Sequence, residues 1–177
     1  TITKEYCGQG AVLGKRQLVI DSEGYRANVA VVLINDEKQV FWCRRIGQDA
    51  WQFPQGGMNE GETPEEAMFR ELREETGLLP HHVDVLGRTR DWLKYNLPEH
   101  LVRRHSKPIC VGQKQVWFLL QFRGTEKDVD LSSYGDRPEF DDWSWVDYEL
   151  PATQVVDFKQ DVYERAMQEL KHLLGPN

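Results

Sequence analysis

The chain has 177 residues and a mass of 20.7 kDa, enough for one domain with a sizeable hydrophobic core. No stretch approaches the roughly 18 consecutive apolar residues of a membrane-spanning helix, and no basic segment followed by an apolar run predicts a secretory signal. The formal net charge of −7 argues against a protein that binds nucleic acid through its overall charge.

The cysteines indicate a reducing compartment. Cys7, Cys43 and Cys110 are odd in number and lack the close spacing of a zinc site. Disulfide frameworks belong to oxidising environments, so we expect free thiols and a cytoplasmic location. Cys43 and Cys110 lie in apolar, strand-like runs and are expected to be small core residues. Trp42 and Trp117 lie in similar runs and are expected in the core as well.

The first part of the chain predicts an arm followed by strands. Residues 1–18 are polar and glycine-rich without a period, which predicts a flexible arm, a segment added for expression, or a docked extra strand. The folded domain is expected to span residues 19–177. The apolar run 28–34 predicts a buried strand, residues 39–44 predict the returning strand, and residues 51–53 predict a short strand that enters a glycine-rich loop.

The box segment, residues 56–78, reads GGMNEGETPEEAMFRELREETGL and predicts a loop followed by a well-defined helix. Thr63 and Glu66 have the spacing of a capping box, and the next residue after the cap is a proline, which suits the first helical position. The helix is expected to span residues 64–76, because Gly77 can adopt the left-handed conformation that ends a helix.

Three carboxylates of this helix, Glu71, Glu74 and Glu75, fall within an arc of roughly a third of the circumference. The adjoining stripe is expected to face the core and consists of Met68, Leu72 and Thr76. Most glutamate-rich helix faces are simply solvated. Carboxylates packed this closely nevertheless repel one another unless a cation lies among them, and hard divalent cations such as Mg²⁺ prefer oxygen ligands shared with substrate phosphates.

The second half of the chain predicts further strands and a closing helix. Strands are expected at residues 83–91, 109–123 and 143–146, and an amphipathic helix at residues 158–174. The inward face of that helix is expected to carry Val162, Ala166, Leu170 and Leu173. Strands interrupted by two helices predict an α+β fold in which a mixed sheet lies between helices.

One segment reverses the acidic balance of the chain. Residues 88–123 contain eight basic residues and only two acidic ones, Asp91 and Glu99, so their net charge is +6. A local basic surface can attract a polyphosphate or the end of a nucleic-acid strand even on an acidic protein. The same side chains could equally well only solubilise a loop, and charge alone does not separate the two interpretations.

A longer pattern in the box segment carries a family resemblance. It reads G-x5-E-x7-R-E-L-x-E-E-x-G-L, from Gly56 through Glu62 and Arg70 to Leu78, and it fills every defined position of the Nudix box. The chain resembles the Nudix hydrolases, in which water attacks a nucleoside diphosphate that is linked to another group. The resemblance implies an α/β/α sandwich that binds two or three Mg²⁺ or Mn²⁺ ions.

The resemblance also implies roles for individual residues. The implied metal ligands are Glu71, Glu74, Glu75, Glu139 and the backbone of Gly56. Glu71 is also expected to take the proton from the attacking water. Arg70 is expected to hold the helix carboxylates through a charge-assisted hydrogen bond. The absence of a Cβ at Gly56 permits its backbone to approach the metals, which neutralise charge on phosphate oxygens and lower the pKa of a bound water.

Segments outside the box resemble one branch of the family, the bacterial RNA pyrophosphohydrolases. These segments are residues 24–29, 51–57, 107–118, 138–143 and 158–163. Enzymes of that branch remove pyrophosphate, or successive phosphates, from the 5′ end of triphosphorylated RNA, which leaves a 5′ monophosphate and triggers mRNA decay. The implied partner is triphosphorylated RNA or a nucleoside polyphosphate, with no membrane partner, and no segment identifies a protein partner.

This second resemblance implies the substrate-binding residues. They are Arg26, Arg45, Tyr95, Val156, Phe158 and Lys159. Arg26 is expected to hold the 5′ phosphates, since a guanidinium suits bidentate phosphate contacts. Arg45 and Phe158 are expected to stack on opposite faces of a base, and Lys159 with the backbone of Val156 is expected to read its edge.

Two other functions stay open from the sequence. The same branch shades into dinucleoside polyphosphate hydrolases that act on free nucleotides. A Nudix scaffold can also serve as a non-catalytic module that binds RNA ends, although such relatives usually lose box carboxylates and none is lost here. Considered without the resemblance, Phe158 could equally be a core residue of the last helix, and Lys159 a solvated lysine.

Overall fold

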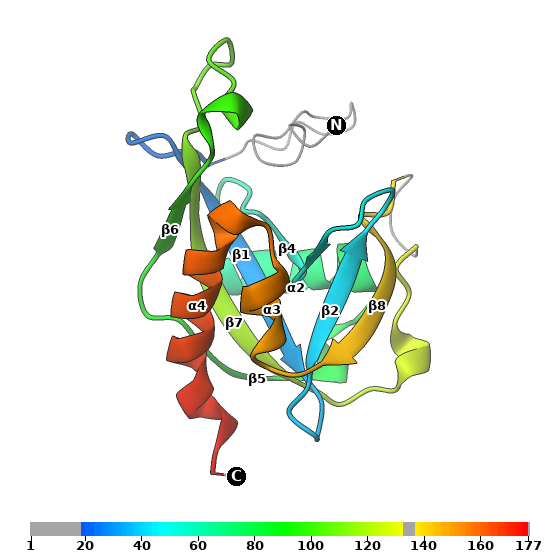
Figure 1. Ribbon diagram of the computed structural model, residues 1–177. Helices are drawn as coiled ribbons and strands as arrows, with labels where there is room; N and C mark the ends of the chain where they lie inside the picture. The colour runs from blue at the N-terminus through cyan, green and yellow to red at the C-terminus, as the bar shows by residue number, and fades with distance from the viewer. Residues whose placement is uncertain (1–18, 133–136, 177) are drawn as a thin grey trace.

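The computed structural model describes residues 19–132 and 137–176, so the predicted arm at residues 1–18 lies outside the described residues. Within these ranges an eight-stranded mixed sheet forms the centre of the molecule (Figure 1). Its strands are β1 (Tyr25–Ile34), β2 (Val40–Arg45), β3 (Trp51–Gln52), β4 (Gln55–Gly57), β5 (Val83–Arg88), β6 (Leu93–Asn96), β7 (Gly112–Phe122) and β8 (Phe140–Val146). The α-helices are α2 (Pro64–Thr76), α3 (Leu150–Gln154) and α4 (Asp157–Lys171). The short 3₁₀ helices are η1 (Pro80–His82), η2 (Glu99–Leu101), η3 (Glu126–Asp128) and η4 (His172–Leu174).

The sheet is built around the parallel pair of β1 and β7. These strands stay in register from Tyr25 opposite Gly112 to Ile34 opposite Gln121. Hydrogen bonding follows the order β3-β2-β1-β7-β5, while β4 also pairs with β1, β6 with β7, and β8 with β2. All these other pairs are antiparallel. Because side chains alternate along a strand, the two central strands supply apolar residues to both faces of the sheet.

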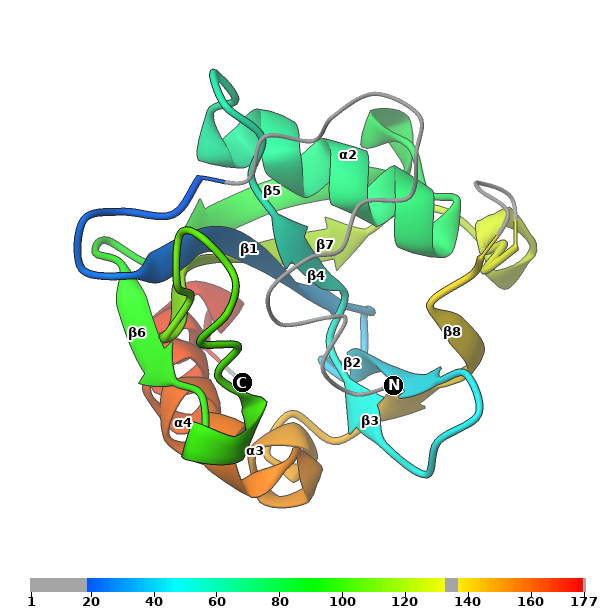
Figure 2. The ribbon, with the colours of Figure 1, turned by 90° about the horizontal axis from the view of Figure 1, so that it is seen from above.

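Helices cover both faces of this sheet (Figure 2). On one face, α2 contributes Ala67, Met68 and Leu72 to a core with Val29, Val31, Leu33, Val116, Phe118 and Leu120 of the central strands. On the other face, α4 contributes Val162, Ala166 and Leu170 to a core with Ala30, Val32, Trp117 and Leu119. The predicted α+β fold, a mixed sheet in an α/β/α sandwich, is therefore confirmed.

The helix of the box segment begins and ends where its local chemistry requires. The Thr63 hydroxyl accepts the backbone N–H of Glu66, and the Glu66 carboxylate accepts the backbone N–H of Thr63, both at 3.2 Å. Pro64 is the first helical residue, and Gly77 ends the helix with φ of 75° while its N–H bonds to the carbonyl of Arg73. The predicted capping box, helix bounds and terminating glycine are all confirmed.

An aromatic cluster ties α4 to the middle of the sheet. The rings of Phe53 and Tyr163 stack with centroids 5.3 Å apart, and Trp42 and Trp117 contact this pair edge-on. The Tyr163 hydroxyl accepts the backbone N–H of Phe53 at 3.2 Å. Trp42 and Trp117 are core residues as predicted, and the cluster fixes the middle of α4 relative to the connection between β3 and β4.

The two cysteines among the described residues lie in the core. Cys43 and Cys110 are buried free thiols, as predicted from their apolar surroundings. Burial, and then the nearby carboxylates of Glu75 and Asp142, raise the pKa of the Cys43 thiol. In the described part of the chain no helix has the length and apolar character needed to cross a bilayer.

Candidate active site

Two adjacent glycines in β4 separate two groups of candidate functional side chains. The side-chain positions of successive strand residues lie on opposite faces of the sheet. A Cβ at Gly56 and a Cβ at Gly57 would therefore point to opposite faces. A Cβ atom at Gly56 would lie 2.0 Å from Cδ of Glu71, and one at Gly57 would lie 2.1 Å from Nη2 of Arg26. Glu71 and Arg26 therefore approach the same short strand from its two faces, and only glycine leaves room for both.

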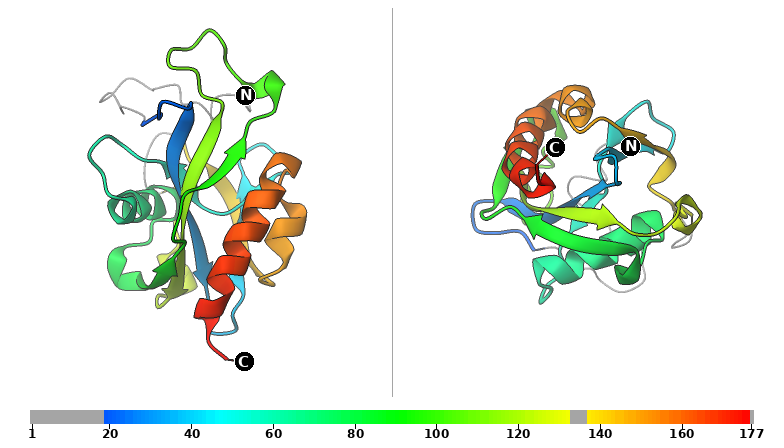
Figure 3. Two further views of the ribbon diagram at one scale, coloured as in Figure 1. Left: turned by 90° about the vertical axis from the view of Figure 1, so that its left-hand side faces the viewer. Right: turned by 90° about the horizontal axis from the view of Figure 1, so that it is seen from below.

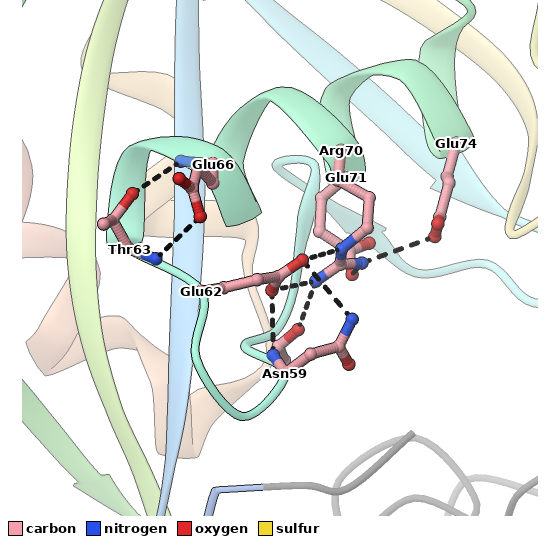
Figure 4. A network of polar contacts seen from close by, with 8 residues as sticks. Asn59, Glu62, Thr63, Glu66, Arg70, Glu71 and Glu74 are labelled. Atoms are coloured by element: carbon pink, nitrogen blue, oxygen red, sulfur yellow. Dashed lines mark hydrogen bonds and ion pairs between the residues drawn. The ribbon is translucent and has the colours of Figure 1, made fainter. Parts of the chain in front are cut away.

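The guanidinium of Arg70 joins this glycine strand to the helix (Figure 4). Its Nη2 donates to the carbonyl of Gly57 at 2.8 Å and to Oε2 of Glu62 at 2.9 Å. Its Nε donates to the other carboxylate oxygen of Glu62 at 2.5 Å. Its Nη1 donates to Oε1 of Glu71 at 2.5 Å and lies 3.6 Å from Oε2 of Glu74. One side chain thus connects three carboxylates and one carbonyl.

Glu62 anchors this network, a role that the sequence did not predict. Its carboxylate also accepts the backbone N–H of Asn59 at 2.8 Å and the side-chain amide of Asn59 at 3.3 Å. The hydrogen bond from Arg70 lowers the pKa of Glu62 in spite of partial burial. Burial alone would lower the pKa of Arg70, but the carboxylates of Glu62 and Glu71 outweigh burial and raise it. Ionised Glu62 therefore fixes Arg70, and Arg70 in turn holds Glu71.

Two of the three box carboxylates, Glu71 and Glu75, approach β4, and the third, Glu74, lies near the guanidinium of Arg70. Glu71 is 5% exposed and Glu75 is 7% exposed, while Glu74 is partly exposed. Oε2 of Glu75 accepts the backbone N–H of Gln55 at 3.0 Å. Within residues 19–132 and 137–176, no three His, Cys, Asp or Glu side chains converge closely enough to hold a metal ion as they stand. The donors still suit a hard cation, because they are carboxylates, and the missing Cβ at Gly56 lets that of Glu71 lie directly against the backbone of β4.

Glu139 lies apart from the box carboxylates in sequence and immediately precedes β8. Its side chain is exposed next to the start of β8, and its backbone carbonyl accepts the N–H of Ile46 at 3.0 Å. Its role as a further metal ligand stays a prediction.

Three of the predicted substrate-binding residues, Arg26, Tyr95 and Phe158, lie on the face that α4 covers, where α4 lies alongside β6 (Figure 3). Arg26 of β1 and Tyr95 of β6 lie opposite the same residue of β7. The ring of Phe158, in the first turn of α4, lies 6.0 Å from the ring of Tyr95 between centroids. Residues from three distant parts of the chain thus form one surface next to Gly57.

Lys159 is not the solvated lysine that its position near a helix start would suggest by default. It is 2% exposed, with Nζ 3.4 Å from Oε1 of Gln52 and 5.9 Å from the centroid of the Tyr95 ring. Arg45, at the end of β2, is also buried at 8% exposure. Val156 precedes α4 and is 45% exposed, and its carbonyl accepts the N–H of Lys159.

The basic segment 88–123 is not one free cationic surface, which corrects part of the expectation from charge. Four of its eight basic side chains form ion pairs with carboxylates, namely Lys94 with Glu23, Arg104 with Glu99, Lys114 with Asp21, and Arg123 with Asp84. Such pairs neutralise much of the local charge, so the segment does not present its full net charge of +6 as one basic surface.

Comparisons with known proteins agree with this geometry. Residues 24–166 match the NUDIX domain family. An RNA pyrophosphohydrolase of Shewanella sediminis is 60% identical over 151 residues, which cover 85% of this chain and 87% of that protein. An RNA pyrophosphohydrolase of Thioalkalivibrio sulfidiphilus is 58% identical over 158 residues, which cover 89% of this chain and 91% of that protein.

A solved structure shares the fold at lower identity. The E. coli dihydroneopterin triphosphate pyrophosphohydrolase superposes with a TM-score of 0.62 over 78% of this chain and 92% of its own, at 22% identity. Nudix hydrolases in general depend on divalent metal ions. The box pattern, the sandwich and the match over most of the sequence agree, and the chain belongs to the Nudix hydrolase family.

Proposed function

We propose that the chain removes pyrophosphate, or two phosphates in succession, from the 5′ end of triphosphorylated RNA and thereby starts mRNA decay. The observation that carries the proposal is the placement of Glu71 and Arg26 on the two sides of Gly56 and Gly57. This places a candidate base and a candidate phosphate-binding guanidinium next to one short strand. The relatives named RNA pyrophosphohydrolase, similar over most of their length, support RNA as the substrate.

The proposed reaction depends on two or three Mg²⁺ or Mn²⁺ ions. The residues that would hold them are Glu71, Glu74, Glu75, Glu139 and the backbone of Gly56. When bound, such ions lower the pKa of a water and offset the charge that develops on phosphate oxygens. Loss of activity on removal of divalent ions, and its return on adding Mg²⁺ or Mn²⁺, checks this dependence.

The protein groups have separate tasks in this proposal. Glu71 accepts the proton of the attacking water, and Arg70 holds the Glu71 carboxylate at 2.5 Å so that it points toward β4. Glu62 keeps Arg70 in place through two hydrogen bonds. Arg26 binds the phosphates on the opposite face of the strand, where a guanidinium can contact two phosphate oxygens at once.

The nucleotide is recognised at the start of α4. A base lies between Phe158 and the planar head of Arg45, where stacking contributes roughly 1–3 kcal/mol and tolerates different bases. Lys159 and the backbone of Val156 read the edge of the base, and Tyr95 contacts phosphate. The buried position of Lys159 supports a directed contact, since its ammonium is aligned by Gln52 instead of moving freely in water.

A rate comparison tests the function. The protein is incubated with Mg²⁺ and either triphosphorylated RNA carrying β- and γ-labels or diadenosine tetraphosphate at equal concentration, and the released species are identified. Faster turnover of the RNA, with labelled pyrophosphate or two labelled phosphates, is expected. A large preference for the dinucleotide would replace the proposal with a dinucleoside polyphosphate hydrolase. Release of no phosphate from either substrate, with Mg²⁺ or with Mn²⁺ in its place, would indicate a module that only binds RNA ends.

A cytoplasmic location is part of the proposal. It is supported by the buried free thiols of Cys43 and Cys110, which suit a reducing compartment. Fractionation of cells that produce the protein at its natural level tests it directly.

A further inference from the structure

Gln113 has a buried side chain that makes no hydrogen bond in the described part of the chain. The residue belongs to β7 and is 0% exposed. Both polar atoms of its carboxamide, Oε1 and Nε2, are buried and lack a partner. Buried polar groups are almost always hydrogen-bonded, because leaving a donor or an acceptor unpaired destabilises the fold. An apolar side chain of similar size would be more stable here, so Gln113 calls for a functional explanation.

Its neighbours are the predicted substrate-binding residues. Gln113 lies directly opposite Arg26 on β1 and directly opposite Tyr95 on β6. Residues that face each other across a sheet point to the same side, so the three side chains form one row across β1, β7 and β6. The ammonium of Lys159 lies over the Tyr95 ring at the end of this row. Gln113 is therefore in the middle of the surface that is proposed to hold the 5′ phosphates.

A second glutamine on the same strand provides a contrast. Gln115 lies two residues further along β7, on the same face, and is 2% exposed. Its Nε2 donates to Oδ1 of Asn28 at 2.8 Å, and its Oε1 accepts Nε1–H of Trp117 at 3.0 Å. The fold thus satisfies a buried glutamine at one position and leaves the next one unsatisfied. The lack of partners at Gln113 is therefore specific to its place in the row.

We propose that the Gln113 carboxamide is a substrate-binding group for the phosphate chain. Its Nε2 donates to a phosphate oxygen of the chain that Arg26 holds, and its Oε1 accepts from a water bound with the phosphates. A neutral donor adds a directed hydrogen bond beside Arg26 without the desolvation cost of a second buried cation. Because Gln113 is fully covered in this structure, the phosphates displace a neighbouring side chain, and Arg26 is the partly exposed member of the row. The inference rests on the proposed function, since it requires a polyphosphate at this face.

The test compares methionine substitutions along one strand face. Gln113→Met removes an unpaired amide, so the melting temperature should stay the same or rise, while kcat/KM for triphosphorylated RNA should fall about 10- to 100-fold, mainly through KM. Gln115→Met breaks two existing hydrogen bonds and should lower the melting temperature by about 2–10 °C. Gln121→Met, at the far end of β7, should leave kcat/KM unchanged. Its melting temperature should fall less than that of Gln115→Met, because the hydrogen bonds of Gln121 are 3.2–3.4 Å long and partly exposed.

A charge change gives a second readout. Gln113→Glu places a carboxylate against the phosphates, so its KM should rise further than that of Gln113→Met, and the difference should shrink in high salt. An unchanged KM in Gln113→Met, or a fall in melting temperature as large as that of Gln115→Met, would overturn the inference and show a structural residue. If the wild-type protein releases no phosphate from any polyphosphate, the proposed function itself fails, which is seen before any variant is made.

Discussion

Replacing Gly56 with alanine perturbs the site at its narrowest point. The added Cβ would lie 2.0 Å from Cδ of Glu71 and 2.3 Å and 2.4 Å from its two carboxylate oxygens. Ordinary contact distances begin at 3.4 Å, so the carboxyl group has to retreat by about 1.4 Å. Such a shift also breaks the 2.5 Å hydrogen bond from Arg70 to Glu71. The fold itself should tolerate the change, because the displaced atoms are the end of a flexible side chain.

The expected loss of activity follows from this displacement. Moving a catalytic group by about 1 Å from its productive position lowers the rate by about 100-fold, which corresponds to about 2.7 kcal/mol. We therefore expect Gly56→Ala to lower kcat by 100-fold or more. Its melting temperature should change by only a few degrees, since no core contact is lost.

Two other glycines make the experiment specific. A Cβ at Gly57 would instead meet Nη2 of Arg26 at 2.1 Å, so Gly57→Ala should mainly raise KM. A Cβ at Gly175 would meet nothing within 4 Å, but its φ of 76° strains an alanine there, so Gly175→Ala is a control for a strained substitution away from the site and should leave kcat and KM unchanged. Single-turnover hydrolysis of triphosphorylated RNA gives the rate of the chemical step, and fluorescence anisotropy of the same RNA gives its affinity. Wild-type turnover in Gly56→Ala, or identical changes in both β4 variants, would refute the reasoning.

Further predictions concern single contacts around Arg70. Glu71→Gln should bind RNA nearly as tightly as wild type while kcat falls about 10²- to 10⁴-fold, which binding and single-turnover assays on the same sample would show. Arg70→Lys cannot reach Glu62, Glu71 and the Gly57 carbonyl together, so the free energy of unfolding in urea should fall by about 1–3 kcal/mol and kcat should fall with it. Thr63→Ala loses the helix cap, so unfolding should cost about 1 kcal/mol less while kcat is unchanged. Arg70 holds the pKa of Glu62 below its usual 4.5. The stabilisation from this carboxylate is therefore present above pH 4.5 and is lost as the pH falls through the lowered pKa. Urea titrations between about pH 6 and pH 3 should accordingly show a shallower acid decline for Glu62→Gln than for wild type.

The parts of the fold that depend on local chemistry could be predicted from the sequence. The helix from Pro64 to Thr76 has the predicted bounds because its cap, its proline and Gly77 are all local signals. The strand β1 was found from its apolar run. Two strands and one α-helix were missed. β4 contains two glycines, β6 is a short polar strand at the edge, and α3 has only five residues. β4 and β6 exist because β1 and β7 supply hydrogen-bond partners from elsewhere in the chain.

The candidate site also has features that local sequence predicts and features that depend on contacts between distant segments. Helical spacing was enough to place Glu71, Glu74 and Glu75 on one edge of α2. That Glu71 meets Arg26 across β4 depends on the register of β4 against β1, which no local pattern reveals. The burial of Lys159 likewise depends on Gln52 and Tyr95, which lie far away in sequence. Gln113 could not be selected either, because only the structure separates it from the hydrogen-bonded glutamine two residues later.

The pair of glycines in β4 has a mechanical consequence. Arg26 and Glu71 contact opposite faces of the same strand, so a displacement of the strand toward one moves it away from the other. With the roles proposed for Arg26 and Glu71, phosphate binding and hydrolysis are therefore coupled through the position of one short strand. Variants that tighten phosphate binding by shifting β4 should turn over more slowly, and a selection for affinity alone would drive the protein toward an RNA-end binder that no longer cleaves.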